Sequence, residues 1–221
     1  LIKDRVTGKL RPERDDGSRI ERVGTYQNGY VDGEHWKVTT LDGTQYFLGL
    51  NQVGTGTATN SVLTEPIYGN HAGEPCNKAT FAASVCTQAY RWSVDKVVDP
   101  LGNVMVFYYA REINHYKRGG LHGVNTAYDA FGRLASIEWG LRAEALGAKA
   151  PAQVVFDVAE RCLPSGAITC DPGQLNKDTA GNWPDVPFDR ICAPGEDCKD
   201  RYSPAYFTRK RLTRVVTRSL K

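Results

Sequence analysis

The longest runs of apolar, strand-forming positions lie in residues 91–109, where two runs rich in Val, Phe, Tyr and Trp flank Asp99-Pro100-Leu101-Gly102. Asp at the first position, Pro at the second and Gly at the fourth are typical of a type I turn. β-branched and aromatic residues favour a pleated, largely buried surface, so the sequence predicts a long antiparallel hairpin. After the turn, apolar side chains alternate onto both faces, which predicts a central strand that is packed on both sides.

A second hairpin is predicted in residues 35–50, where Asp42-Gly43 separates two alternating runs. An Asp-Gly pair between strands favours a type I′ turn, in which both central residues have positive φ. Alternating apolar positions predict further strands over 18–24, 151–160 and 205–220.

The spacing of Asp99 and Gly102 is repeated in residues 128–141, which contain Asp129-Ala130-Phe131-Gly132 followed by an alternating run. This repetition predicts a second type I turn and strand, with Gly102 and Gly132 in equivalent places and both at positive φ. Repeated strand–turn–strand units favour a stack of hairpins, each burying a face on its neighbour.

The stretches without a clear strand pattern indicate how the chain is organised. Residues 1–29 form a polar leading segment, and residues 30–221 form a single antiparallel β domain with excursions at 51–89 and 161–203 that are rich in turn-forming residues. A helix-tolerant run at 79–85 interrupts the first excursion, and residues 112–127 read as a polar loop. The predicted fold class is therefore mainly β, with antiparallel stacked hairpins, long disulfide-stapled loops and at most one or two short helices.

Composition narrows the classes of function. Apolar residues at 41% and charged residues at 24% are typical of soluble globular chains. A net charge of +3 is too small to indicate a nucleic-acid or anionic membrane partner. No apolar run approaches the roughly 18 residues needed for a membrane-spanning helix. Because the sequence begins at Leu1 and ends in a strand-like run, we expect it to be a piece of a longer polypeptide.

Six cysteines fall as local pairs within the turn-rich stretches, and the closest partners along the chain are Cys76 with Cys86, Cys162 with Cys170, and Cys192 with Cys198. An even number of paired cysteines favours disulfides, which persist in oxidising compartments. Sequence alone permits other connectivities, so local pairing is a preference. The alternatives are reduced, buried cysteines or a zinc site, but zinc sites generally contain tightly spaced pairs such as Cys-x2-Cys. We therefore expect an extracellular location.

Residues capable of chemistry are scattered. The sequence contains no Gly-rich phosphate loop, G-x-S-x-G or H-E-x-x-H motif, and we predict no cofactor, metal or catalytic residue. Glu138 and Asp157 are the carboxylates that a glycoside hydrolase would require, although each fits a solvent-facing strand position better. His115 and His122 fit a surface loop better than a metal site.

Two further groups have both a binding and a structural interpretation. Trp36 would suit a sugar-stacking platform, but its place on an alternating strand favours the core. The basic run near the C-terminus contains Arg209, Lys210, Arg211, Arg214 and Arg218. Because no recognised nucleic-acid motif accompanies this run, it is better explained as the charged outer face of an edge strand.

Tyr128-Asp129-x-x-Gly132-Arg133-Leu134 resembles the signature of the Rhs/YD-repeat family, and Val98-Asp99-x-x-Gly102-Asn103-Val104 resembles its common variant. The resemblance extends over most of residues 30–221 and includes the hairpin at 35–50, the cysteine-bearing loops and WPDVPFDRIC at 183–192. Because one strict copy of the repeat is present, the chain resembles a segment that flanks the repeat array of a large secreted actinobacterial Rhs protein.

This resemblance implies a non-catalytic structural segment of a bacterial polymorphic-toxin type of protein. Such a segment would contribute to a β-shell that encapsulates or presents a C-terminal toxin or effector, and its partner would be the rest of the same polypeptide. The alternative is a cell-surface adhesion or carbohydrate-binding module that contacts glycans through Trp and Tyr. An enzyme, represented by Glu138, ranks last.

Overall fold

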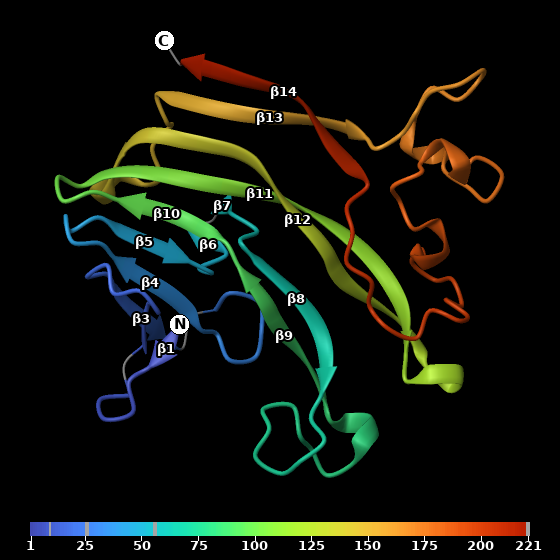
Figure 1. The fold of residues 1–221 in the computed structure, drawn as a ribbon, viewed down its shortest axis with the longest axis horizontal. Coiled ribbons are helices and arrows are strands. Elements are labelled where there is room, and N and C mark those ends of the chain that lie inside the picture. The colour runs from blue at the N-terminus through green and yellow to red at the C-terminus, as the bar shows by residue number, and fades with distance from the viewer. Residues whose placement is uncertain (9, 25–26, 55–56, 220–221) are drawn as a thin grey trace. The chain divides into compact units, whose positions relative to one another are not determined.

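The computed structural model describes residues 1–8, 10–24, 27–54 and 57–219, and confirms a mainly β, antiparallel fold (Figure 1). The strands are β1 Ile2–Lys3, β2 Leu10–Arg11, β3 Arg19–Val23, β4 His35–Thr39, β5 Gln45–Leu48, β6 Gln52–Val53, β7 Thr57–Ala58, β8 Val62–Tyr68, β9 Val85–Trp92, β10 Val94–Val98, β11 Asn103–Arg118, β12 Val124–Arg142, β13 Ala152–Glu160 and β14 Lys210–Ser219. The strand predicted over 205–220 therefore begins five residues later, and its last residue lies outside the described residues.

Ten strands form one sheet in the order β1-β2-β3-β4-β5-β10-β11-β12-β13-β14, while β6–β7 and β8–β9 are separate two-stranded pairs. The predicted central hairpin is confirmed, because β10 pairs with β11 in antiparallel register, with Val98 opposite Val104. The hairpin at 35–50 is likewise formed by β4 and β5, with Trp36 opposite Leu48.

The described part of the chain contains no α-helix. Its helical content consists of six 3-10 turns of three residues each: η1 Phe81–Ala83, η2 Gly120–His122, η3 Ala143–Ala145, η4 Pro172–Gln174, η5 Ala180–Asn182 and η6 Phe188–Arg190. The predicted helix-tolerant run at 79–85 thus contributes only the single turn η1.

Three stretches contain more strand than predicted. Residues 1–29 contain β3, which confirms the strand predicted over 18–24, and also β1 and β2; residues 51–89 contain β6, β7, β8 and the start of β9. The polar loop expected at 112–127 is wrong, since β11 runs to Arg118 and β12 begins at Val124. Buried Asn114 and Tyr116 alternate there with more exposed neighbours such as Ile113, which is the pattern of a strand with one buried face. Residues 161–203, by contrast, have only 3-10 turns and one isolated bridge between Ser165 and Ile168.

The chain divides into two compact units, and β11, β12, β13 and β14 each contribute residues to both. Unit 1 comprises residues 1–110, 134–155 and 217–221, and unit 2 comprises residues 111–133 and 156–216.

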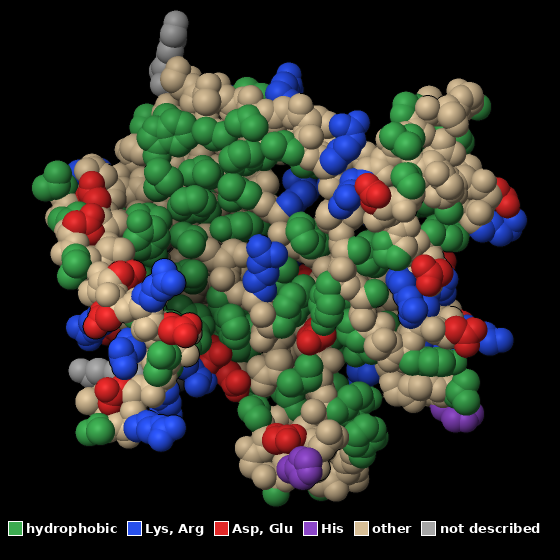
Figure 2. Space-filling view, in the orientation of Figure 1, with side chains coloured by type: hydrophobic (Ala, Val, Ile, Leu, Met, Phe, Trp, Pro, Cys, Tyr) green, Lys and Arg blue, Asp and Glu red, His purple; other side chains and the backbone are tan. Residues whose placement is uncertain are grey.

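The core of unit 1 lies on one face of β11. Val104 and Val106 are buried there with Val53, Leu141 and Ala150. Met105, on the opposite face, is 38% exposed, so the prediction that this strand is packed on both sides is wrong at that position. Hydrophobic side chains gather on the visible face over this part of the sheet (Figure 2). Apolar side chains therefore do lie on both faces of β11, but within unit 1 one of these faces is buried and the other is partly exposed.

Unit 2 has two small buried clusters. Tyr116, Tyr128 and Ala130 form the first, at the β11–β12 pair, and their positions two residues apart place Tyr128 and Ala130 on one face of β12. The second contains Cys162, Trp183 and Val186, around which the strand-poor residues 161–203 fold.

Candidate functional site

The first motif copy forms the β10–β11 turn, as predicted. The Gly102 N–H donates to the Asp99 carbonyl at 3.0 Å, and the Asp99 N–H donates to the Asn103 carbonyl at 3.1 Å. The Asp99 carboxylate accepts the N–H groups of Leu101 at 2.9 Å and Asn103 at 2.8 Å, and the Asn103 interactions lower the pKa of Asp99. Gly102 has a φ of 78°, which glycine adopts without steric cost.

The β4–β5 turn has the same hydrogen-bond pattern. The Gly43 N–H donates to the Thr40 carbonyl, and the Thr40 N–H donates to the Thr44 carbonyl, each at 2.9 Å. Gly43 has positive φ but Asp42 does not, so the predicted type I′ turn is wrong. A type I turn closed by a left-handed glycine, the usual longer hairpin loop, accounts for both turns. Gly43, and not Gly132, is the structural equivalent of Gly102.

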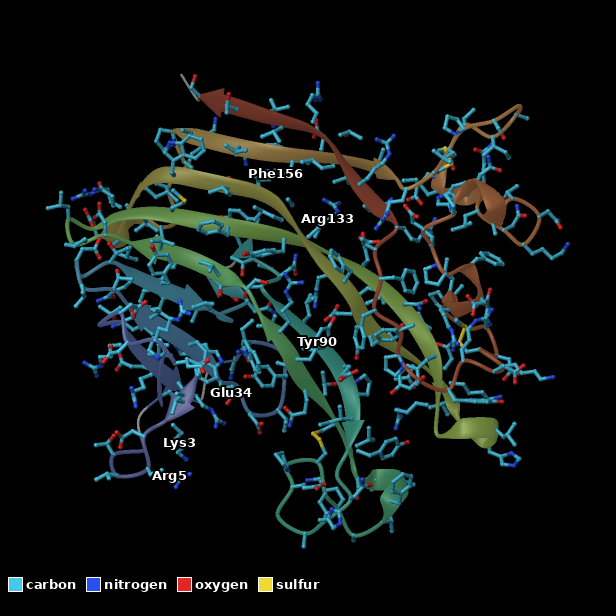
Figure 3. The ribbon with its side chains drawn as sticks, in the orientation of Figure 1. Lys3, Arg5, Glu34, Tyr90, Arg133 and Phe156 are labelled. Atoms are coloured by element: carbon cyan, nitrogen blue, oxygen red, sulfur yellow. A yellow bond between two sulfur atoms is a disulfide. The ribbon has the colours of Figure 1, made fainter. Side chains whose placement is uncertain are left out.

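The second motif copy is not a turn. Tyr128, Asp129, Gly132 and Arg133 all lie within β12, and Gly132 has no positive φ, so the expected equivalence of Gly132 with Gly102 is wrong. Arg133 lies on the same long strand in Figure 3. Burial explains the difference, because Tyr128, Asp129 and Gly132 are buried and extended backbone keeps their peptide groups paired within the sheet.

Tyr128 holds a distant segment of unit 2. Its hydroxyl donates to the Ala205 carbonyl at 2.7 Å and accepts the Ala205 N–H at 2.8 Å. The amide of buried Asn114 donates to the same hydroxyl at 3.0 Å. Asp129 is also buried and lies 3.5 Å from the Arg111 guanidinium. The polar residues of this motif therefore act by fixing backbone and neighbouring side chains.

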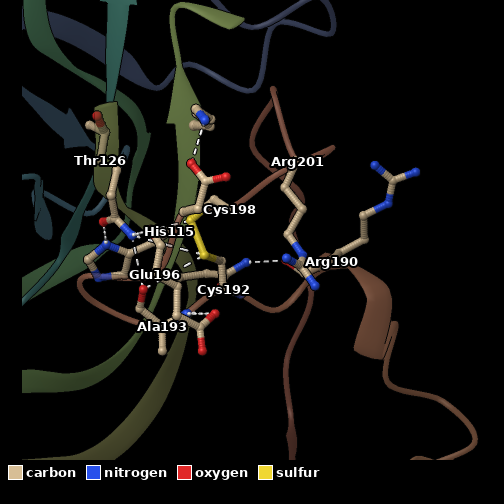
Figure 4. The surroundings of a disulfide bond; sticks show 12 residues. His115, Thr126, Arg190, Cys192, Ala193, Glu196, Cys198 and Arg201 are labelled. Carbon is tan, nitrogen blue, oxygen red and sulfur yellow. Dashed lines mark hydrogen bonds and ion pairs between the residues drawn. A yellow bond between two sulfur atoms is a disulfide. The ribbon is translucent and has the colours of Figure 1, made fainter. Parts of the chain in front are cut away.

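All six cysteines are in disulfides, and the pairs are those expected from their spacing: Cys76–Cys86, Cys162–Cys170 and Cys192–Cys198. Hydrogen bonds reinforce the third loop (Figure 4). The Asn125 amide donates to the carbonyls of Ala193 at 3.0 Å and Glu196 at 2.9 Å, and the Asn125 carbonyl oxygen lies 2.6 Å from His115 Nδ1. His115 is therefore part of this network.

His122 lies in η2. No group of three or more His, Cys, Asp or Glu side chains that could hold a metal ion occurs among the residues that the structure describes. In the same part of the chain, no helical segment has the length and apolar character of a membrane span.

Asp95 is a fully buried carboxylate that the sequence analysis missed. The Leu50 N–H donates to its Oδ2 at 2.7 Å, and the Thr59 hydroxyl donates to its Oδ1. Burial raises the pKa of Asp95, although hydrogen bonds from Thr59 and Ser61 oppose the shift. The residue ties β10 to the connections on either side of β6 and β7, 36 and 45 positions earlier in the chain.

Glu160, at the end of β13, is a second buried carboxylate that was missed. Its oxygens accept hydrogen bonds from Lys210 Nζ, from Trp183 Nε1 at 3.0 Å and from the Arg209 guanidinium at 3.1 Å. Burial alone would raise the pKa of Glu160, but the hydrogen bonds from Lys210 and Trp183 and the charges of Arg209 and Lys210 outweigh it and lower that pKa.

The predicted basic edge strand is largely paired with acidic groups. Besides Arg209 and Lys210, Arg214 forms an ion pair with Asp157 at 2.6 Å. Asp157, a hydrolase candidate, thus serves as a partner of β14 in unit 2. Trp36 is half-buried and packs edge-on against Trp92 with ring centroids 6.2 Å apart, which agrees with its interpretation as a packing residue.

Glu138, the other hydrolase candidate, lines a cavity of about 600 Å³ in unit 1. Val53, Leu146 and Ala150 form an apolar wall that continues into the unit 1 core. The polar lining consists of side chains from five strands and the loop after η3: Thr57, Tyr108, Ser136, Glu138, Lys149, Gln153 and Arg218. The alternation in residues 135–139 placed Glu138 on a strand, but only the three-dimensional fold reveals the cavity.

No family model and no curated protein matches this sequence. Among solved structures, the chain is similar to the crystal structure of TcdB2-TccC3, with 16% sequence identity and a TM-score of 0.39 over 68% of this chain and 6% of that chain. It is also similar to the N-terminal domain of the effector protein SpvB from Salmonella typhimurium strain LT2, with 15% identity and a TM-score of 0.36 over 76% of this chain and 46% of that chain. The chain spans less than half the length of each of these solved chains.

Proposed function

We propose that this chain is a non-catalytic structural segment of a large secreted protein of the Rhs/YD-repeat type. The proposal rests on the structural roles of the residues in the two motif copies. Asp99 closes a hairpin turn, and Tyr128 joins β12 to Ala205 through both backbone groups of that residue. Motif residues that hold strands and their connections together are what a repeat serving as scaffold requires.

The disulfides support an extracellular location for this segment. Bonds of this kind persist in secreted and cell-surface proteins and are rare in reducing compartments. Two of the three lie within residues 161–203, where they replace the strand pairing that this stretch lacks. These cross-links would hold the loops of 161–203 in a segment exposed outside the cell.

The proposed partner is the remainder of the same polypeptide, with the segment supplying strands to a β-shell around a C-terminal effector. The test uses the full-length parent protein, with limited proteolysis followed by mass spectrometry of the part downstream of residue 221. We expect that part to resist protease in the parent protein and to be cleaved rapidly when it is produced alone. Equal cleavage in both forms would overturn the shell proposal.

A matched pair of variants tests whether the motif serves this role. Tyr128→Phe leaves the N–H and carbonyl of Ala205 without their hydroxyl partner, so it should increase cleavage of the downstream part in the parent protein. Tyr202→Phe is the control, because the Tyr202 side chain is exposed and its hydroxyl meets only Asp200 at 3.4 Å. Identical cleavage in the two variants would show that Tyr128 has no part in the proposed protection of the downstream part.

A further inference from the structure

The cavity in unit 1 contains a carboxylate held in a fixed orientation. Glu138 on β12 lies directly opposite Gln153 on β13, and Gln153 Nε2 donates to Glu138 Oε1 at 3.0 Å. Tyr108, on neighbouring β11, lines the same cavity, and its pKa responds to the charge of Glu138. Three adjacent strands therefore bring a carboxylate, the amide that orients it and a phenol to the lining of one cavity.

The phenol of Tyr108 keeps its proton at neutral pH. Burial, followed by the charge of Glu138 and its hydrogen bond, raises the pKa of Tyr108 to about 12. Tyr108 therefore presents a hydroxyl donor to the cavity, and Glu138 keeps acceptor capacity beside its bond from Gln153, because a carboxylate can accept about four hydrogen bonds. Ser136, two residues from Glu138 on the same face of β12, adds a hydroxyl to this lining.

Two cations line the same cavity. Lys149 lies in the loop after η3 and Arg218 near the end of β14, and both are exposed. Within the described residues, no carboxylate is paired with either cation, and Glu138 is the one acidic residue of the lining. A concave surface with an excess of unpaired positive charge attracts anions.

The lining thus combines three chemical features. Glu138 and Gln153 suit ligand hydroxyl groups, Lys149 and Arg218 suit a negative group, and the apolar wall around Leu146 suits the C–H face of a ring. A cavity of about 600 Å³ falls within the range of small-ligand sites. A ligand that carries hydroxyls and a carboxylate on one compact ring matches all three features.

We propose that this cavity binds an acidic saccharide, with ring hydroxyls at Glu138, Gln153 and Ser136 and the sugar carboxylate at Lys149 and Arg218. The carboxylate of the sugar would lie away from Glu138, because two like charges repel, and towards the guanidinium of Arg218, whose fork matches a carboxylate. This assignment concerns unit 1 alone and does not depend on the proposed role as a shell segment.

The test is a titration of the oxidised chain with methyl glucuronide and, separately, with methyl glucoside, followed by NMR or calorimetry at low ionic strength. We expect the glucuronide to bind about tenfold more tightly than the glucoside, and its advantage to shrink as salt screens the cations. Sodium acetate should compete poorly, since it lacks the hydroxyls. Equal binding of both sugars, competition by acetate equal to that of the glucuronide, or no binding at tens of millimolar would each overturn the proposal.

Variants separate the two halves of the site. Lys149→Gln and Arg218→Gln, both at exposed positions, should reduce glucuronide binding to the level of the glucoside and leave glucoside binding unchanged. Glu138→Gln should weaken both sugars by about tenfold, with thermal unfolding as the check that the variant folds. Lys177→Gln is the control, because Lys177 is an exposed cation outside the cavity. If Lys177→Gln weakened glucuronide binding equally, the cause would be the net charge of the protein, and the proposed site would be contradicted.

Discussion

Asp95 and Glu160 are both buried carboxylates, one in each compact unit, and their surroundings shift the pKa in opposite directions. Asp95 receives hydrogen bonds from a backbone N–H and a hydroxyl, so burial prevails and its pKa rises. Glu160 receives hydrogen bonds from Lys210 and Arg209, so positive charge prevails and its pKa falls. The difference shows that burial alone does not decide the charge of a group.

The partners of each buried carboxylate match the architecture of the unit in which it lies. Asp95 lies among paired strands in unit 1, where the sheet already satisfies most backbone groups and a few neutral donors suffice. Glu160 lies where β13 gives way to residues 161–203, which have turns and disulfides but almost no strand pairing. There, one carboxylate joins β13 to Trp183 and to the start of β14.

The largest effect should come from Glu160→Gln. The amide cannot neutralise Arg209 and Lys210, and removing one partner of a buried ion pair costs about 3 kcal/mol. Urea unfolding measures the loss, and hydrogen exchange should locate it in residues 161–203 and β14. Asp185→Asn is the control, since the ion pair between Asp185 and Arg161 is mostly exposed and should contribute less than about 1 kcal/mol. Equal losses in both variants would contradict the role of Glu160.

The second-largest loss of stability tests whether unit 2 depends on its disulfides as much as on Glu160. Replacing Cys162 and Cys170 by Ser should cost about 2–3 kcal/mol, as expected for a disulfide that closes a short loop. Hydrogen exchange should increase around Trp183, which packs against Cys162, and should change little in the β10–β11 hairpin. Replacing Cys76 and Cys86 is the matched control within unit 1. Loosening of the β10–β11 hairpin by the unit 2 change would contradict this local effect.

A smaller loss is expected from Asp95→Asn. The amide oxygen can keep the Leu50 N–H and the NH₂ can donate to the Thr59 hydroxyl, which would have to reverse its role, so the cost should be about 1 kcal/mol. Urea unfolding is again the measurement, and exchange should increase at Leu50. Asp42→Asn, at an exposed turn, is the control. No loss beyond that of the control would show that Asp95 is dispensable in unit 1.

Sequence reasoning succeeded where the deciding contacts are local. The Asp99 turn is set by Pro100, Gly102 and hydrogen bonds to residues at most four positions away, all of which are visible in the sequence. Asp129-Ala130-Phe131-Gly132 has the same spacing, but Ala130 lacks the restraint on φ that Pro100 supplies, and Tyr128 finds its partner at Ala205, 77 residues away. Tertiary burial therefore made a strand of the second copy.

The same reasoning explains the missed carboxylates. Asp95 meets Thr59 across 36 residues, and Glu160 meets Lys210 across 50 residues. No local pattern marks such a pair, because surface and buried acidic residues occupy similar positions in alternating strands. The disulfides were predictable since each pair is at most 10 residues apart. Glu138 was placed on a strand correctly, but its cavity is lined by segments far apart in the chain, from Val53 to Arg218.

The smallest effect is the pH dependence of stability, which tests the opposed pKa shifts directly. Because the pKa of Glu160 is below its ordinary value of 4.5, its contribution is present above that pH and is lost as the pH falls through the folded-state pKa. Because the pKa of Asp95 is above its ordinary value of 3.8, its contribution is present below that pH and is lost as the pH rises through the folded-state pKa. The two groups therefore act in opposite directions across the acidic range.

Urea unfolding of the wild type and both variants between pH 3 and 7 separates the two contributions. The destabilisation caused by Glu160→Gln should shrink as the pH falls below about 4.5, because the carboxyl of the unfolded wild type has the higher pKa and its protonation favours the unfolded state. The destabilisation caused by Asp95→Asn should grow over the same range, because the wild-type protein gains stability as buried Asp95 takes up its proton. If the destabilisation changed with pH in the same way in both variants, the cations around Glu160 and the neutral donors around Asp95 would not shift the two pKa values in opposite directions. The proposed difference between the two units would then be wrong.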